Sequence, residues 1–212
     1  DCGNCHGDGF WEACIGTDDC NDMDCSGECG GYSVIDDCGT CDDFHANDCI
    51  DLVVHLHGGA NLISFSAFPD SISSYPDRIS ISSVFGECLN ETGNGVMGAG
   101  VGAVLIDGEW IGSLNEISQE DGYWAILQES CDLHMDDAIP TNHDDDGEVI
   151  YDMEYGPNLI SYSHLEIQYL EDALGDAVDF IFAILGEGEA AIHNDDWGGS
   201  LTQFKPNHGY WI

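Results

Sequence analysis

Two stretches of the chain alternate apolar residues with others at a period of two, a pattern that predicts β-strands. The alternating positions are Leu52, Val54 and Leu56 in the first stretch and Val149, Tyr151, Met153 and Tyr155 in the second. Glycine-containing turns follow, at Gly58-Gly59 and at Gly156-Pro157. Because a strand, a short glycine turn and another strand form a hairpin, we expect one hairpin at each place.

The strand after each of these turns has nearly the same sequence. Gly59-Ala-Asn-Leu-Ile-Ser-Phe-Ser66 returns as Gly156-Pro-Asn-Leu-Ile-Ser-Tyr-Ser163. Two shorter sequences also recur, in the same order: Trp110-Ile-Gly-Ser-Leu114 as Trp197-Gly-Gly-Ser-Leu201, and Gly122-Tyr-Trp124 as Gly209-Tyr-Trp211. The sequence therefore predicts two copies of one module. Within them, Asn61 and Asn158 are expected to close turns rather than to form a binding site.

The segment between the recurring sequences predicts a helix in each copy. Apolar residues at helical spacing indicate a helix over residues 169–185 of the second copy, although Gly175 weakens it. In the first copy a shorter helix is expected within residues 74–85. Small-residue strands follow at residues 95–106 and 186–192, and Asp107-Gly108 predicts a tight hairpin turn.

Together these patterns predict a mainly β fold with short helices, of the α+β class. We expect a cysteine-rich, irregular head at residues 1–50 and a β-rich module at residues 51–131. An acidic linker at residues 132–147 then leads to the second, homologous β-rich module at residues 148–212.

Charge limits what the chain can bind. It has 42 acidic residues and two basic ones, Arg78 and Lys205, for a formal net charge of −40. Such a chain repels nucleic acid and anionic membranes. No apolar run reaches the ~20 residues that span a bilayer, so no membrane insertion is expected. Cations are its natural partners, because so large a charge needs screening or bound ions. Adaptation to salty water and specific Ca²⁺ binding both explain it.

Eleven cysteines indicate an oxidising compartment, and hence an extracellular or cell-surface protein. The head has few apolar residues for a core and is expected to rely on disulfides or ions. Its nine cysteines are Cys2, Cys5, Cys14, Cys20, Cys25, Cys29, Cys38, Cys41 and Cys49. Because nine is odd, one of them is free, pairs between subunits or pairs with a later cysteine. The other two, Cys88 and Cys131, are expected to pair with each other.

Two other uses of the head cysteines compete with disulfides. Cys2-Gly-Asn-Cys5-His6 fits the C-x-x-C-H pattern of haem attachment. The related Asp37-Cys-Gly-Thr-Cys41 is followed by Asp42 where a haem ligand is needed, which argues against haem. Paired C-x-x-C sequences also bind zinc. The acidic, secreted character of the chain favours disulfides over both.

Two segments are candidates for calcium, whose ligands are hard oxygens. In the head, the candidate ligands among the cysteines are Asp18, Asp22, Asp24 and Glu28. Between the modules, the candidate ligands are Asn142, Asp144, Asp146 and Glu148. Position twelve of an EF-hand loop would be Met153, so a looser calcium loop is expected there. The alternatives are a solvated acidic loop in the head and a flexible acidic linker between the modules.

A few other residues have a choice of roles. His55 and His57 share a strand face, where facing solvent is favoured over a metal pair. Tryptophans at equivalent positions of the two copies are more typical of a core than of a surface that stacks on sugar rings. These are Trp110 with Trp197 and Trp124 with Trp211. Asn90-Glu-Thr92 is an N-glycosylation acceptor pattern and predicts a surface loop.

The cysteine spacing of the head carries a family resemblance. Asp24-Cys-Ser-Gly-Glu-Cys-Gly-Gly-Tyr-Ser-Val-Ile-Asp-Asp-Cys-Gly-Thr-Cys41, running on to Asn47-Asp-Cys49, resembles repeats of large secreted surface proteins from marine bacteria. The recurring Asn-Leu-Ile-Ser, Trp-x-Gly-Ser-Leu and Gly-Tyr-Trp sequences resemble C-terminal modules of the same proteins. The resemblance implies a surface location and a modular architecture, and it implies no activity. Asp1 falls within a repeat unit, so we expect the precursor to continue upstream.

No enzyme motif stands out. The chain has no G-x-S-x-G, H-E-x-x-H or P-loop sequence, and carboxylate pairs are too common in it to indicate glycoside hydrolysis. We therefore expect no catalytic residues. The leading hypothesis is an extracellular structural subunit that assembles with itself into a surface filament or layer, supported by Ca²⁺ and disulfides. The alternative is a monomeric adhesion or carbohydrate-binding module that takes glycans, at the end of a large secreted surface protein.

Overall fold

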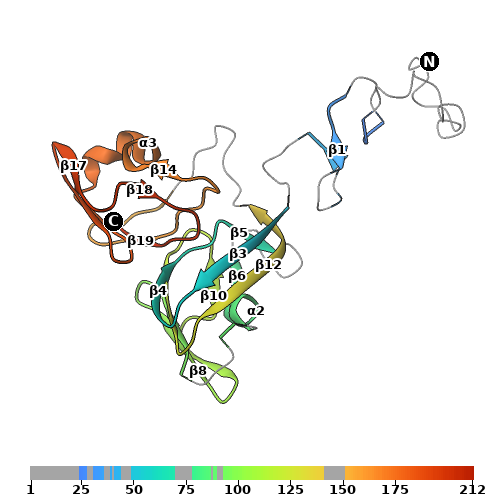
Figure 1. Ribbon diagram of the computed structural model, residues 1–212, viewed down its shortest axis with the longest axis horizontal. Coiled ribbons are helices and arrows are strands. Elements are labelled where there is room, and N and C mark those ends of the chain that lie inside the picture. The colour runs from blue at the N-terminus through green and yellow to red at the C-terminus, as the bar shows by residue number, and fades with distance from the viewer. Residues whose placement is uncertain are drawn as a thin grey trace, which may run out of the picture. The chain divides into compact units, whose positions relative to one another are not determined.

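The computed structural model describes residues 24–27, 31–35, 39, 41–43, 49–69, 78–86, 88–89, 93–140 and 151–212 (Figure 1). The chain divides into two units, Asp1–Cys49 and Ile50–Ile212. The described part is mainly β-strand with short helices, which confirms the predicted fold class. The division after Cys49 falls one residue before the predicted end of the head.

The described part of the head contains a short hairpin. β1 (Val34–Ile35) pairs antiparallel with β2 (Cys41–Asp42). A disulfide between Cys25 and Cys41, with Cα atoms 5.8 Å apart, links this hairpin to the preceding turn. Cys49 is buried and also disulfide-bonded. These bonds support an oxidising compartment.

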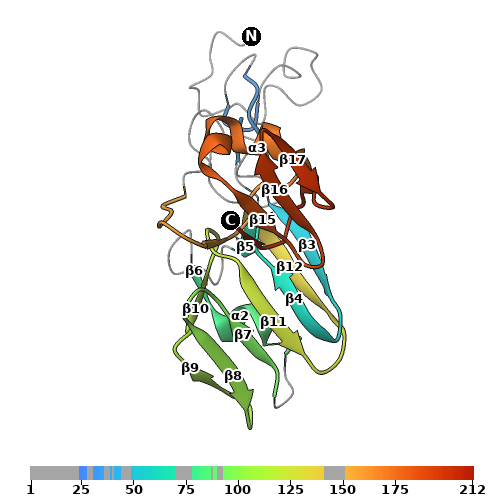
Figure 2. The same cartoon turned by 90° about the vertical axis from the view of Figure 1, so that its left-hand side faces the viewer.

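Residues 50–140 form module 1, whose larger sheet has five antiparallel strands (Figure 2). In order across the sheet they are β4 (Gly59–Ile63), β11 (Tyr123–Leu127), β7 (Gly95–Met97), β8 (Gly102–Ile106) and β9 (Glu109–Gly112). Asp107 and Gly108 form the turn between β8 and β9, with φ of 51° and 85°. Positive φ at both positions is the tight hairpin turn that the sequence predicts.

A second sheet of module 1 has three strands, which are β3 (Ile50–Leu56), β12 (Cys131–Pro140) and β5 (Ala67–Pro69), with β12 in the middle. The predicted hairpin of β3 with β4 is therefore wrong, because the two strands enter different sheets. The predicted linker is also wrong over residues 132–140, which belong to β12. Disulfide bonding of Cys88 to Cys131, the expected pair, ties the start of β12 to the segment after the helix.

A short helix completes module 1. β6 (Arg78–Ser80) pairs with β10 (Glu116–Ser118) and runs directly into α2 (Ile81–Phe85). The hydroxyl of Ser80 accepts a hydrogen bond from the Ser83 backbone N–H at 3.2 Å and so caps the helix. The helix is shorter than predicted, because residues 78–80 are a strand.

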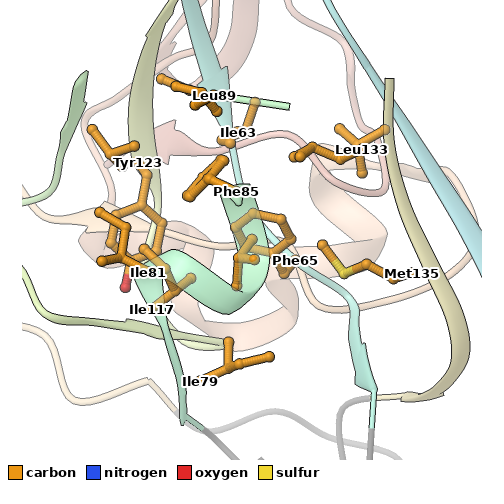
Figure 3. Packing of buried hydrophobic residues seen from close by; sticks show 14 of the residues in the cluster. Ile63, Phe65, Ile79, Ile81, Phe85, Leu89, Ile117, Tyr123, Leu133 and Met135 are labelled. Carbon is orange, nitrogen blue, oxygen red and sulfur yellow. The ribbon is translucent and has the colours of Figure 1, made fainter. Parts of the chain in front are cut away.

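The core of module 1 takes side chains from both sheets and from α2 (Figure 3). Phe65 is fully buried, with its ring centroid 5.4 Å from that of Phe68 and 6.0 Å from that of Phe85. Leu133 and Met135 of β12 face this cluster and are each 3% exposed. β12 therefore covers one side of the aromatic core.

Residues 151–212 form module 2, which repeats the larger sheet. Its strands are β13 (Leu159–Ile160), β19 (Tyr210–Trp211), β15 (Ala183–Leu185), β16 (Ala190–Asn194) and β17 (Asp196–Gly199), in that order across the sheet. Each strand stands where its counterpart stands in module 1. Two copies of one sequence pattern thus form two copies of one sheet.

The helical segment of module 2 departs from its prediction. β14 (Gln168–Tyr169) pairs with β18 (Gln203–Phe204) and leads into α3 (Leu170–Leu174). Gly175 has a φ of 49° and is the first residue of a 3-10 helix, η5 (Gly175–Phe180). The predicted helix over residues 169–185 is therefore wrong in its length, because Gly175 ends α3 and the last three residues form β15.

Module 2 lacks the three-stranded sheet among its described residues. The residues that correspond to the end of β3 are 151–153, and they form no strand. The predicted hairpin of residues 149–155 with the following strand is thus wrong for residues 151–155, and residues 149 and 150 lie outside the described part. The described part of module 2 thus has the shared sheet and helix but no strand in the position that β12 holds in module 1.

Candidate functional site

The two modules contact each other where strands of each module end. We call this contact the joint, and it consists of residues 62–64 and 120–122 of module 1 and residues 159–161 and 207–209 of module 2. Isolated β-bridges pair Ile63 with His208 and Asp121 with Ile160. The strand end of each module thus pairs with the other module. The joint is the candidate functional site, because it is where the module recognises a copy of itself.

The hydrogen bonds of the joint come in equivalent pairs. The Ser64 N–H donates to the Asn207 carbonyl at 3.1 Å, and the Ser161 N–H donates to the Glu120 carbonyl at 3.0 Å. Ser64 corresponds to Ser161 in the recurring sequence. A contact that is repeated when the two partners are exchanged is the self-complementary type found in symmetric dimers.

A second pair of bonds runs through the glycines of the Gly-Tyr-Trp sequences. The Gly209 N–H donates to the Leu62 carbonyl at 3.2 Å, and the Gly122 N–H donates to the Leu159 carbonyl at 3.3 Å. A Cβ on Gly122 would lie 2.6 Å from the Ile160 oxygen. A Cβ on Gly209 would lie 2.6 Å from the equivalent Ile63 oxygen. Only glycine lets the backbones approach this closely.

Buried hydroxyls add to the backbone pairing at the joint. The Ser64 hydroxyl donates to the His208 carbonyl at 2.8 Å and accepts from the Tyr162 N–H at 3.2 Å. The Ser66 hydroxyl and the Asn207 side-chain oxygen are 3.0 Å apart. Ser64 and Ser66 are fully buried, so their hydrogen bonds leave no polar group of these side chains unsatisfied.

The contact between His57 and Glu187 is not repeated on the other side of the joint. The Nε2 of His57 lies 2.6 Å from a carboxylate oxygen of Glu187, whose other oxygen accepts from the Leu62 N–H at 2.8 Å. The Nδ1 of His57 lies 2.9 Å from the Gly58 carbonyl. The Gly58 carbonyl and the Glu187 carboxylate both raise the pKa of His57 above its ordinary value. A charged His57 therefore strengthens the joint. Position 154, which corresponds to His57, is a glutamate.

Asn61 and Asn158 close the turns before the recurring strands. The side-chain oxygen of Asn61 accepts from the His57 N–H at 2.9 Å, and its amide donates to the His57 carbonyl at 2.8 Å. Asn158 makes the same two bonds to Glu154, at 2.8 and 2.9 Å. This agrees with the turn-closing role predicted for both asparagines.

The tyrosine of each Gly-Tyr-Trp sequence also has a structural partner. The Tyr123 hydroxyl oxygen accepts from the Ser118 N–H at 2.7 Å, and that of Tyr210 accepts from the Lys205 N–H at 2.9 Å. Burial raises the pKa of Tyr210 to about 12 and that of Tyr123 further. Both hydroxyls stay neutral at physiological pH. They hold the backbone of the preceding segment in place.

The equivalent tryptophans pack partly against the cores. The ring centroid of Trp110 lies 6.3 Å from that of Phe85, and that of Trp197 lies 4.9 Å from that of His193. Trp110 and Trp197 pack against the two cores, as the predicted preference for core over sugar stacking expects. Trp124 and Trp211 are half-buried and alternate along their strands with the core residues Tyr123 and Tyr210, so no core role is shown for them.

The histidines of the first strand do not form a pair. The Nδ1 of His55 lies 2.8 Å from an Asp132 carboxylate oxygen on the neighbouring β12, whereas His57 turns to Glu187. His55 is 79% exposed, as a solvent-facing role predicts. Within the described residues, no group of three or more His, Cys, Asp or Glu side chains is placed to hold a metal ion.

Most of the predicted ion and modification sites lie outside the described residues. This holds for Asp18, Asp22, Glu28, Asn142, Asp144, Asp146, Glu148 and Asn90, and for Cys2, Cys5, Cys14, Cys20, Cys29 and Cys38. Asp24 is described, and it organises its own turn. One of its carboxylate oxygens accepts from the N–H and the hydroxyl of Ser26, and the other accepts from the Ser33 N–H at 3.2 Å.

A polar hollow of about 350 Å³ lies on module 1. Its lining includes Arg78, Asn115, Asp121 and Tyr123. Arg78 is one of the two basic residues of the chain, and the other, Lys205, pairs with Glu189 at 2.9 Å. Hydroxyl, amide and charged groups around one hollow are the groups that recognise a polar ligand.

Comparison of the chain with protein-family models, curated proteins and solved structures found no match. None of the helices in the described residues has both the length and the apolar character needed to cross a bilayer. The joint glycines escaped prediction as contact residues. Their recurrence before Tyr-Trp was the available signal.

Proposed function

We propose that the chain is an extracellular structural protein, a subunit that assembles with itself into a surface filament or layer. One observation carries the proposal: the module docks with its own copy through reciprocal backbone hydrogen bonds at the joint. A fold that already recognises itself within one chain is suited to an architecture built by repetition. The family resemblance of the head supports a surface location.

The negative charge of the chain implies that assembly requires cations. With a formal net charge of −40, subunits repel one another until the charge is screened or neutralised. Calcium bound by the candidate ligands Asn142, Asp144, Asp146 and Glu148, or by the head carboxylates, lowers that repulsion and links assembly to the ion. Disulfides then stabilise the assembled form against unfolding in an oxidising medium.

Electron microscopy of the purified protein with and without calcium tests this function. We expect filaments or layers in millimolar CaCl₂ that disperse when a chelator is added, and no assembly in NaCl of matched ionic strength. A protein that stays a dispersed monomer in millimolar calcium contradicts the proposal. Assembly in NaCl alone keeps the structural function and replaces the calcium role by screening.

A matched pair of variants locates the calcium effect. Asp144→Asn with Asp146→Asn removes two candidate ligands, and Asp152→Asn with Glu154→Gln removes the same charge nearby. We expect the first pair to raise the calcium concentration needed for assembly more than the second does. An equal effect of both pairs means that charge, not a calcium loop, controls assembly.

The alternative is a monomeric adhesion or carbohydrate-binding module. In such a module, the polar hollow beside Arg78 and Tyr123 is a better candidate for the glycan site than the half-buried tryptophans. Binding of the monomer to a glycan array, lost in Arg78→Gln, supports this alternative. Assembly without glycan binding supports the structural function.

A further inference from the structure

The two helices occupy equivalent places but are covered differently. α2 buries Ile81, Val84 and Phe85. α3 buries only Leu170, whereas Ala173 and Leu174, which take the places of Val84 and Phe85, are partly exposed. The same helix face is thus closed in module 1 and open in module 2.

The cover in module 1 is a β-strand. Leu133 and Met135 project from β12, two residues apart, onto the face that carries Phe65 and Phe85 (Figure 3). No described residue of module 2 takes the place of β12.

A groove marks this place in module 2. It has a volume of about 520 Å³, and its lining includes Tyr151, Tyr162, Ala173, Leu174 and Phe204. Tyr162 is the counterpart of Phe65. Because Ala173 and Leu174 are smaller than Val84 and Phe85, the groove has room for larger side chains than those of β12.

The head carries an exposed apolar segment with the spacing of β12. Tyr32 and Val34, two residues apart, are 85% and 50% exposed, and Ile35 is 68% exposed. Among the described strands, β1 pairs with β2 alone, which leaves its other edge for a further partner. An edge strand with apolar side chains at alternate positions is what a vacant strand site accepts.

We infer that residues 31–35 of one copy lie in the module 2 groove of a second copy, in the place that β12 holds in module 1. Tyr32 and Val34 fill the space beside Ala173 and Leu174. A head that docks on the next copy is a head-to-tail contact, which continues into an open chain of subunits. The inference rests on the proposed structural function and identifies the contact that builds the assembly.

The charges at this contact link it to cations. Asp172 and Asp176 line the groove, and Asp36 and Asp37 follow the docking segment in the sequence. Docking brings these carboxylates together, so it requires that their charge be screened or neutralised. The contact therefore forms in high salt or in calcium and opens when they are removed.

Complementary variants of the full chain test the inference. Tyr32→Ser with Val34→Ser removes the docking side chains, and Ala173→Phe fills the groove. Each variant alone is expected to raise the protein concentration needed for assembly by about tenfold or more, since burial of one large apolar side chain contributes at least that factor. Ala173→Asp serves as a second groove variant, and unchanged circular dichroism shows that each variant is folded.

Mixing gives the sharpest result. The head variant keeps its groove and the groove variant keeps its head, so the two together form a one-to-one dimer that neither forms alone. Sedimentation velocity in millimolar calcium measures it. Ile192→Ser, on the exposed face of β16, is the control and is expected to assemble like the unaltered chain.

Three results overturn the inference. If the head and groove variants assemble normally, the contact is elsewhere and the structural function stands. If Ile192→Ser alone abolishes assembly, the exposed sheet face is the contact. If the unaltered chain remains a monomer under all of these conditions, the proposed function fails together with the inference.

Discussion

Module 1 and module 2 share a sheet, a helix and a tyrosine that holds the backbone, but among the described residues only module 1 has a strand in the position of β12. In module 1 that strand lies between β3 and β5 and places Leu133 and Met135 on the aromatic core. In module 2 the corresponding helix face lines a groove. The recurring sequences thus specify the shared frame, and a strand outside them determines whether the core is closed.

The residues that the two modules share differ from those that leave a groove open in module 2. The Asn-Leu-Ile-Ser and Gly-Tyr-Trp residues close turns, bond backbone amides and form the joint, so they are present in both modules. The groove exists because Ala173 and Leu174 replace larger residues and no described strand covers them. Substitutions at equivalent positions of the two modules should therefore have unequal effects on stability.

Truncation of the equivalent helix residues gives the largest contrast. Phe85→Ala removes a fully buried ring and is expected to lower the free energy of unfolding by about 3–5 kcal/mol. Leu174→Ala, at a partly exposed position, is expected to cost about 1 kcal/mol. Urea unfolding of the dispersed protein measures both. Equal losses contradict an open face in module 2.

Removal of the module 1 disulfide comes next. Cys88→Ala with Cys131→Ala is expected to lower the stability of module 1 by about 2–5 kcal/mol, because the bond restricts the unfolded chain and fixes the start of β12. Module 2 contains no cysteine. Tryptophan fluorescence of Trp211, with the other tryptophans replaced by Phe, is expected to report little change. A similar loss in module 2 means that the modules unfold as one.

Substitution of the joint glycines tests whether the two sides of the joint are equivalent. Gly209→Ala places a Cβ 2.6 Å from the Ile63 oxygen and is expected to cost about 1–3 kcal/mol, as is Gly122→Ala. Gly198→Ala is the control, because a Cβ there meets no atom within 4 Å. Thermal unfolding measures all three. Loss at Gly122 without loss at Gly209 contradicts the reciprocal joint.

The turn-closing asparagines are expected to differ by their burial. Asn61 is buried, so Asn61→Ala leaves the His57 backbone groups without partners and is expected to cost about 2 kcal/mol. Asn158 is accessible enough for water to replace its bonds, and Asn158→Ala is expected to cost about 1 kcal/mol or less. Chemical denaturation of the two variants side by side provides the test. A larger loss at Asn158 reverses the expected order.

The smallest effect is a dependence on pH through His57. Its pKa is raised in the folded protein by the Gly58 carbonyl and the Glu187 carboxylate. The resulting stabilisation is fully present below the ordinary histidine value of about 6.5 and is lost as pH rises through the raised pKa. Nuclear magnetic resonance titration of His57 gives its pKa. Glu187→Gln removes only one of the two causes and is expected to lower the pKa part of the way.

Local features of the fold were predictable from the sequence. Asp107-Gly108 forms its turn, Asn61 and Asn158 close theirs, and Cys88 pairs with Cys131, since each depends on short sequence patterns or on a small set of partners. Strand pairing was less predictable. β3 pairs with β12, which lies some 75 residues further along the chain and not beside it in sequence. Leu133 and Met135 have the alternate spacing of a strand, but the acidic residues around them made the segment resemble a linker.

The joint could not be predicted, for a different physical reason. Close backbone approach at Gly122 and Gly209 depends on the other module, and no local pattern encodes a partner's carbonyl position. The groove was also hidden, because it depends on small residues in α3 and on which strands lie beside that helix in the described part of module 2. Both became evident only when the two copies were compared in three dimensions.

Amide hydrogen exchange tests the central claim most directly, by comparing the protein in millimolar calcium with the same protein after chelation. We predict that assembly slows exchange in residues 151–162 and 170–177, which line the open groove. Exchange in residues 54–65 and 81–86, their counterparts in module 1, is predicted to be slow and unchanged under both conditions. Assembly that leaves exchange in module 2 unchanged would contradict the account.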